Sequence, residues 1–354
     1  MKMRLINKMR SVRMDREGIT LLVMLAVLLL LPSYFHGNQY IMHILIMCLV
    51  YSVVAVGWDF MLGYAGIFTF GQFGFFAVGA YASGMLTLYA GMPVPLGILI
   101  GGLITAGVGV LIGLPCLRLK GAYIALVTFA FHLILVPLIN SDLGRAMGTG
   151  GTMGLLSIPT LAVGSYSFSV ADKIPWYYTL IGVAFLSFFI IYRITHSSIG
   201  LAFVSLRDSE PLAKSAGVDD FKHKLMVFAI SAFLTGVIGA FYAHYVGIVS
   251  TRILGLDIFL LVMVMMVIGG MGKFPGAAIG AFIITFLNEA LRPLEEYRLL
   301  ILGAIVVAVI IFVPEGLMGA LFPTGRVGPG ERFGYFIRRT FTRKPSKNSG
   351  KELL

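Results

Sequence analysis

Apolar runs long enough to cross a lipid bilayer recur along almost the whole sequence. A run of roughly 20 apolar residues is enough for one transmembrane helix, and a helix satisfies its own backbone hydrogen bonds in lipid. Only 12% of the 354 residues are charged, whereas a soluble domain carries about 25%. The sequence therefore predicts an all-α polytopic membrane protein.

Ten runs are predicted to form transmembrane helices. They cover approximately residues 19–35, 40–62, 70–90, 96–114, 122–140, 176–194, 225–247, 258–269, 275–291 and 299–313. The first run follows a basic stretch, as in a signal peptide, but no small-residue cleavage site comes after it, so we expect it to remain as a helix. The chain thus divides into a basic tail (1–18), a transmembrane domain (19–318) and a second basic tail (319–354).

The positions of lysine and arginine predict the orientation of these helices. Ten crossings place both tails on one side, and five of the 27 basic residues fall on the other side: Arg145, Lys173, Arg252, Arg292 and Arg298. Because cytoplasmic segments are rich in lysine and arginine, both termini and the loop 195–224 are predicted to be cytoplasmic. The loop 141–175 is predicted to face outward. The net charge of +11 is then a topology signal, and no nucleic-acid partner is expected.

An even number of helices also predicts two halves of five helices each. An odd number of crossings in each half makes the second half enter the membrane from the opposite face, which is the inverted repeat found in many transporters. In such folds, paired glycine- or proline-interrupted segments mark the transport pathway. The glycine-rich segments 63–71 and 269–276 are the candidates for such a pair.

The stretch Gly63–Gly84 has six glycines in 22 residues. In its second part, Gly79 with Ser83 and Ala80 with Gly84 have the spacing of a small-residue face that packs on another helix. The first part is too polar and too rich in glycine for a lipid-facing helix, and broken backbone at this depth occurs only inside protein or beside a water-filled cavity. This predicts a lining for a substrate pathway, with packing alone as the alternative. The candidate pathway residues are Asp59, Gly63, Gly66, Thr69, Gly71 and Gln72.

The loop 195–224 contains the signals of one short helix. Asp208 or Ser209 is the predicted N-cap, Pro211 lies in the first turn, and Gly217 is the predicted stop. An isolated helix of two turns is unstable in water, so this helix should dock on the membrane domain or on a partner. An ordinary structured loop is the alternative.

No motif in the sequence predicts catalysis. Neither Gly-Lys dipeptide continues into the serine or threonine of a phosphate-binding loop, and Cys48 and Cys116 are expected to be buried and unpaired. The polar residues within the runs are His43, His132, His244, Asn288 and Glu289. Hydrogen bonding between helices is the expected role of the histidines, and a role with a proton or substrate is the alternative. A proton-coupled secondary transporter is therefore an alternative from another functional class.

Several motifs occur in a fixed order along the chain. They are Leu62–Gly66 with Gly71 and Phe75–Gly84, Leu117–Thr128, Thr149–Gly154, Gly200–Arg207 with Glu210, Ala213 and Gly217, Tyr242–Tyr245, and Gly269–Gly272. Together they resemble the permease subunits of the branched-chain amino acid ABC importer family, with the matches in that family's order over about residues 40–315. The 141–175 loop makes the chain similar to the larger of the two permeases. Two positions depart from the family pattern, since Gln72 stands where histidine is usual and Asp59 where asparagine is common.

The resemblance implies a type II-like importer domain in the bacterial inner membrane, surrounded by membrane lipid. It implies a second permease, two ATPase subunits that hold the ATP and magnesium, and a periplasmic binding protein that delivers the substrate. No cofactor and no enzyme activity are expected in this chain. The implied substrate is a branched-chain or related amino acid, with urea or short amides as alternatives. The ATPase-coupling residues are expected to be Gly200, Arg207, Glu210, Leu212, Ala213 and Gly217.

Overall fold

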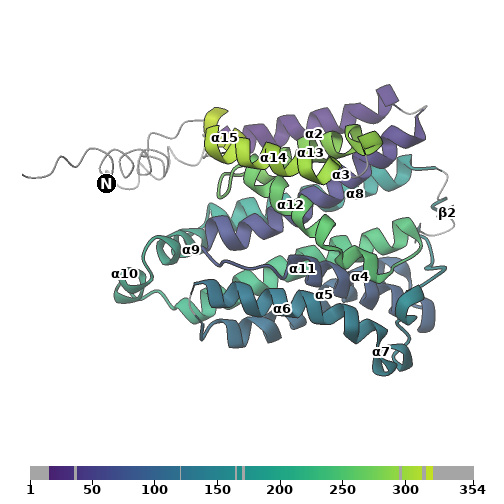
Figure 1. Ribbon diagram of the computed structural model, residues 1–354, viewed down its shortest axis with the longest axis horizontal. Helices are drawn as coiled ribbons and strands as arrows, with labels where there is room; N and C mark the ends of the chain where they lie inside the picture. The colour runs from purple at the N-terminus through teal and green to yellow at the C-terminus, as the bar shows by residue number, and fades with distance from the viewer. Residues whose placement is uncertain are drawn as a thin grey trace, which may run out of the picture.

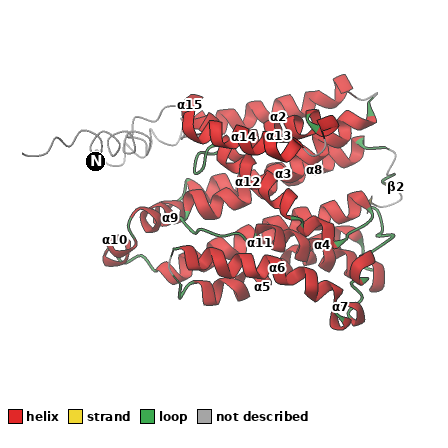
Figure 2. Ribbon diagram, viewed as in Figure 1, coloured by secondary structure: helices red, strands yellow, loops and turns green. Residues whose placement is uncertain are grey.

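The computed structural model describes residues 16–35, 38–119, 121–163, 166–169, 172–294, 297–312 and 316–321. The two predicted basic tails, 1–18 and 319–354, lie almost entirely outside the described residues. Within the described part the chain is overwhelmingly helical, as Figure 2 shows. One small hairpin joins β1 (Ala162–Val163) to β2 (Tyr166–Ser167), which pair in antiparallel fashion.

Each of the ten predicted runs coincides with a helix. In chain order these are α2 (Arg16–Phe35), α3 (Gln39–Asp59), α4 (Gln72–Tyr89), α5 (Val94–Cys116), α6 (Ala122–Asn140), α8 (Ile174–Thr195), α11 (Asp220–Val246), α12 (Leu256–Gly269), α13 (Gly276–Ala290) and α14 (Tyr297–Phe312). The shorter helices are α7 (Asp142–Ala146), α9 (Ser198–Asp208), α10 (Glu210–Ser215) and α15 (Gly316–Leu321).

Five of the described helices are long and apolar enough to cross a membrane on their own. They are α3 with the turn that follows it, α5, α6, α8 and α11. The helices α12 and α13 are apolar but shorter, with 14 and 15 residues. The chain is thus a multi-helix membrane protein in which some apolar helices are shorter than a full span.

The helices form two groups with α12 between them (Figure 1). One group contains α2, α3, α8, α13 and α14, and the other contains α4, α5, α6 and α11. The pair α4 and α5 packs against α11, and the pair α12 and α13 packs against α3. The helices α7 and α10 lie at opposite ends of the bundle.

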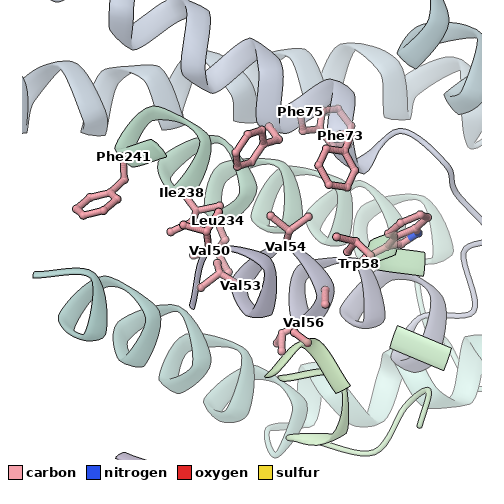
Figure 3. Close-up of a cluster of buried hydrophobic side chains, with 14 of the residues drawn as sticks. Val50, Val53, Val54, Val56, Trp58, Phe73, Phe75, Leu234, Ile238 and Phe241 are labelled. Atoms are coloured by element: carbon pink, nitrogen blue, oxygen red, sulfur yellow. The ribbon is translucent and has the colours of Figure 1, made fainter. Parts of the chain in front are cut away.

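Helix α3 lies at the centre of the core. Of its most apolar stretch 78% is buried inside the protein, compared with 33% for α5 and for α6. Its side chains meet α4 and α11, as Figure 3 shows for Val54, Phe73 and Leu234. A helix that is apolar on every side needs such a position, since no polar face directs it to solvent.

The predicted small-residue face is confirmed as a packing surface. A Cβ atom at Gly79 would overlap the backbone of Gly236 in α11. One turn further, Ser83 accepts or donates a hydrogen bond of 2.9 Å with His244 Nε2. Backbones that approach this closely exclude any side chain between them, which is the reason for glycine at these positions.

The predicted outer loop 141–175 is anchored to the rest of the protein. Leu155 forms an antiparallel bridge with Val249, in the segment between α11 and α12. Gly154 has φ +73°, and a Cβ atom there would overlap the backbone carbonyl of Val249. The glycine cluster thus serves a close backbone contact.

Candidate functional site

The first glycine-rich segment interrupts the helix path between α3 and α4. Helix α3 ends at Asp59 and continues as a π-helical turn, Phe60–Tyr64, and residues 65–71 are not helical. Gly66 has φ +67°, a conformation that residues with a side chain rarely adopt. The prediction of broken backbone at this place is confirmed.

The protein interior supplies hydrogen-bond partners to this broken backbone. The Trp58 indole N–H donates to the Thr69 carbonyl at 2.7 Å, and the Phe70 N–H donates to Thr128 Oγ1 at 2.9 Å. Exposure alternates along the segment, because Gly66 and Phe68 are exposed whereas Ile67 and Thr69 are buried. One edge of the segment is therefore held in the core and the other is open.

The second glycine-rich segment, between α12 and α13, lies against the first. Asp59, which is only 3% exposed, accepts a hydrogen bond from the Gly272 N–H at 2.7 Å through Oδ1. The Phe274 N–H donates to the Tyr64 hydroxyl at 2.9 Å. A Cβ atom at Gly63 would overlap the Gly272 backbone. Two segments that are about two hundred residues apart in sequence thus form a single site.

Arg207, near the end of α9, completes this site. Its Nη1 donates to the Gly63 carbonyl at 2.5 Å, and its Nε and Nη2 donate to Asp208 Oδ1 at 3.1 and 3.0 Å. A Cβ atom at Gly66 would lie 2.6 Å from Arg207 Cγ, so the arginine stem passes directly over that glycine. We call the group of Asp59, Gly63, Gly66, Arg207 and Gly272 the glycine junction.

The other three predicted pathway residues lie apart from the junction, at the start of α4. Gln72 is fully buried, and its Nε2 donates to Ser231 Oγ at 3.1 Å and to Thr235 Oγ1. The Thr69 hydroxyl accepts from the Gly71 N–H at 3.3 Å. These residues fix the beginning of α4 against α11 and the preceding loop.

An aromatic cluster surrounds the places where α4 and α12 begin. The Phe259 ring lies 5.3 Å from Trp58, 5.7 Å from Phe70 and 5.8 Å from Phe129, measured between ring centroids. Sequence analysis did not identify this cluster, because its members come from four separate parts of the chain. It seals the buried edge of the first glycine segment with apolar surface.

Hydrogen bonding between separate segments is confirmed for two of the three histidines. His43 Nδ1 lies 2.7 Å from the Tyr245 hydroxyl. His244 contacts Ser83 through Nε2, and its Nδ1 lies 2.7 Å from the Pro159 carbonyl. His132 is fully buried, and among the described residues neither of its ring nitrogens has a hydrogen-bond partner. Its ring instead lies against Phe129 and Phe259.

The segment 195–224 contains two helices, where one was predicted. The predicted short helix is present as α10, with Ser209 preceding it, Pro211 in its first turn and Gly217 at φ +84° after it. Helix α9 was missed, and so was the extension of α11 back to Asp220. Gly200 lies in the first turn of α9, where a Cβ atom would overlap the Thr195 carbonyl.

Ion pairs fasten α10 to the start of α11. Glu210 accepts from Lys224 Nζ at 2.8 Å and from Lys214 Nζ at 2.9 Å, and Lys214 also reaches Asp220 at 2.8 Å. The hydrogen bonds from Lys224 and Lys214 lower the pKa of the Glu210 carboxyl to about 2. On α10 itself, Ala213 is buried and Leu212 is 71% exposed. The helix therefore presents an apolar side chain outward from a fixed position.

The described residues offer no metal site of the usual kind, since no three His, Cys, Asp or Glu side chains gather among them. Cys48 and Cys116 are buried and unpaired, as predicted. A cavity of about 350 Å³ lies between α12 and α14, with a lining of aliphatic residues such as Leu260, Val264 and Leu302. The described residues of its walls hold no group that could bind a charged ligand.

Comparison with known proteins gives a family match over most of the chain. The family described as branched-chain amino acid transport system / permease component matches residues 40–310. The high-affinity branched-chain amino acid transport system permease protein LivM of Escherichia coli is 30% identical, over 76% of this chain and 68% of its own length. LivM of Salmonella typhimurium is 29% identical, over 81% of this chain and 72% of its own length. The permease protein LivH of Escherichia coli is 23% identical, over 76% of this chain and 91% of its own length.

Proposed function

The chain belongs to the family of branched-chain amino acid transport system permease components, and from this premise we propose that it is a membrane subunit of an ABC importer for branched-chain or related amino acids. The observation that carries the proposal is the family match, which includes both glycine segments and the α9–α10 segment. The two LivM relatives are named for branched-chain amino acid transport. In this role the chain provides part of a path through the membrane.

We propose that all ten apolar helices cross the membrane and that they form two inverted halves. The packing supports this, because α4 and α5 lie against α11 just as α12 and α13 lie against α3. When the halves are paired in chain order, the break before α4 corresponds to the break before α12. The segment 269–276 lies between α12 and α13, so in this arrangement the two glycine segments are not the equivalent pair expected from the sequence, although they meet at one site.

We propose the domain arrangement and orientation that the basic residues predict. Residues 19–318 form the membrane domain, the segment 195–224 and both tails are cytoplasmic, and the loop 141–175 faces the periplasm. The position of α7 and α10 at opposite ends of the bundle supports this assignment (Figure 1). The membrane is the bacterial inner membrane.

The energy for transport would come from partner subunits. Helix α10, with Leu212 exposed and Glu210 held by two lysines, has the features of a helix that docks into an ATPase. ATP and magnesium would bind to two such ATPase subunits, and this chain would carry out no reaction itself.

LivM and LivH relatives share the name of one transport system, which supports a second permease beside this chain. A periplasmic binding protein would deliver the substrate.

We propose that the substrate path runs beside the glycine junction. Non-helical backbone inside a membrane is tolerated where it is buried or lines a water-filled cavity. The segment 65–71 has one open edge, at Gly66 and Phe68, on the side away from the core. In this proposal Asp59, Gly63 and Gly66 hold the edge through the junction, whereas Thr69, Gly71 and Gln72 would support it from the start of α4.

Reconstitution tests the function directly. The chain would be placed in liposomes with its second permease, its ATPases and its binding protein, and uptake of labelled leucine would be measured with and without ATP. We expect ATP-dependent uptake that isoleucine and valine inhibit and that urea and acetamide do not. Uptake by this chain alone, driven by a proton gradient, would instead establish a secondary transporter.

Labelling of single cysteines tests the orientation. Ser215→Cys replaces the last residue of α10, and Met153→Cys replaces a side chain that is 76% exposed in the loop 141–175. In a background without Cys48 and Cys116, an impermeant thiol reagent added to cells with a permeabilised outer membrane should label Met153→Cys and leave Ser215→Cys unlabelled. The reverse pattern would mean that the protein has the opposite orientation.

A further inference from the structure

Arg207 is the residue at which the α9–α10 segment meets the first glycine segment. It is the penultimate residue of α9, three residues before Glu210 begins α10. Its guanidinium donates to the Gly63 carbonyl at 2.5 Å, and its stem crosses Gly66. The side chain is 34% exposed, so it lies at the boundary between the membrane domain and the loop.

The same arginine is close to the second glycine segment. A Cβ atom at Gly272 would lie 2.9 Å from the Gly63 carbonyl oxygen and 3.4 Å from Arg207 Nη1. The Gly272 N–H in turn donates to Asp59. A displacement of the guanidinium therefore acts on the Gly63 carbonyl directly and on the Gly272 backbone through its immediate neighbours.

Helix α9 makes a second contact with the same short stretch of chain. The Phe203 ring packs edge-on against Phe60, with 5.6 Å between ring centroids. Phe60 and Gly63 both belong to the π-helical turn Phe60–Tyr64. Turns of this type are rare and occur frequently at functional sites. Both contacts of α9 thus fall on the turn where the α3 helix path changes.

We propose that Arg207 is a positioning residue that transmits movement of the ATPase-docked α9–α10 segment to the glycine junction. This inference rests on the proposed function, because it assumes that α10 contacts an ATPase. When the ATPases move α10, α9 moves with it, and the hydrogen bond from Arg207 carries the displacement to Gly63 and hence to the edge at Gly66 and Phe68. The hydrogen bond from Arg207, beside the Phe203–Phe60 contact, then links ATP hydrolysis to the opening of the path.

The test compares Arg207→Gln and Arg207→Lys with the control Arg193→Gln. Arg193 is an exposed arginine in the last turn of α8, and it has no place in the junction. Each variant is reconstituted in the full complex, and leucine uptake is measured beside ATP hydrolysis. For Arg207→Gln we expect hydrolysis to be retained and uptake per ATP to fall by about tenfold or more, the effect of losing a charged hydrogen bond.

The lysine variant separates charge from geometry. Lysine keeps the charge but lacks the planar fork that allows Arg207 to bond Gly63 and Asp208 together, so Arg207→Lys should give intermediate coupling. Arg193→Gln should leave uptake per ATP unchanged. If uptake and hydrolysis fall in proportion in Arg207→Gln, or if neither falls, the inference is wrong.

A second measurement does not depend on the substrate. Phe68, at the open edge and 40% exposed, is replaced by cysteine in a background without Cys48 and Cys116. Its alkylation rate should change between the nucleotide-free and the vanadate-trapped complex, and this change should vanish with Arg207→Gln. A change that persists in the variant would overturn the inference. A complex that shows this behaviour and takes up no branched-chain amino acid would contradict only the proposed substrate.

Discussion

Replacement of Leu212 by aspartate tests the docking role of α10. Burial of a whole leucine side chain is worth about 1.5–3 kcal/mol, and Leu212 is 71% exposed in the isolated chain. A partner that covers the exposed part would gain roughly 1–2 kcal/mol. Loss of that energy weakens association about 5- to 30-fold, and a carboxylate left in an apolar interface weakens it further. Because Leu212 is already exposed, the fold itself should change in stability by no more than about 0.5 kcal/mol.

The assay is a titration of detergent-solubilised permease with labelled ATPase subunit, beside uptake in cells and the amount of protein in the membrane. Leu143→Asp is the matched control, since Leu143 is 63% exposed and lies in α7 at the opposite end of the bundle. We expect the control to bind the ATPase normally and Leu212→Asp to bind weakly. Normal ATPase affinity together with full uptake in Leu212→Asp would refute the docking role.

Three further tests address the packing, the junction and the ion pairs. Gly79→Leu should lower the melting temperature in detergent, because overlap with the Gly236 backbone costs about 1–3 kcal/mol, and Gly107→Leu, with no atom within 4 Å, should not. Asp59→Asn keeps an acceptor for the N–H of the second glycine segment and should retain uptake, whereas Asp59→Ala should lose most of it. Equal uptake by the two variants would show that the hydrogen bond to Asp59 has no role at the site. The Glu210 carboxyl has its pKa lowered from 4.5 to about 2, so its ion pairs stabilise α10 above pH 4.5 and are lost as the pH falls towards 2. A spin label after α10 should therefore gain mobility only in that range, and a gain near neutral pH would contradict the assignment.

Most helices of this protein can be predicted from the sequence, because each is specified by local features such as an apolar run or residues that favour a helix end. An apolar run predicts a helix without knowledge of its neighbours, and all ten runs coincide with helices. Helix α10 was predicted for the same reason, since Pro211 and Gly217 mark its two ends. Helix α9 was missed because Gly200 in its first turn suggests a break, and only its packing against Thr195 explains that glycine.

The candidate site could be predicted only in part. The glycines indicated where the backbone is broken, and those breaks are present. Gly63 contacts Gly272 and accepts a hydrogen bond from Arg207. These residues lie far apart in the chain, so no local sequence pattern predicts the contacts. Gln72 was grouped with Asp59 because both are polar and near glycine, yet it is bound to α11. Its partners Ser231 and Thr235 lie in the predicted run 225–247, and no local pattern in that run indicates that they face Gln72.

The π-helical turn Phe60–Tyr64 contains one residue more than an α-helical turn at the same place would contain. Each residue of an α-helix advances the chain by about 1.5 Å and rotates it by about 100°. If this turn tightened to α-helical geometry, the residues after it would therefore rotate by about that angle relative to Trp58, which is fixed in the core. The Gly63 carbonyl would turn away from Arg207, and the open edge at Phe68 would face a different direction. A shift of one hydrogen-bond register, with no movement of a whole helix, is thus enough to reorient the segment before α4.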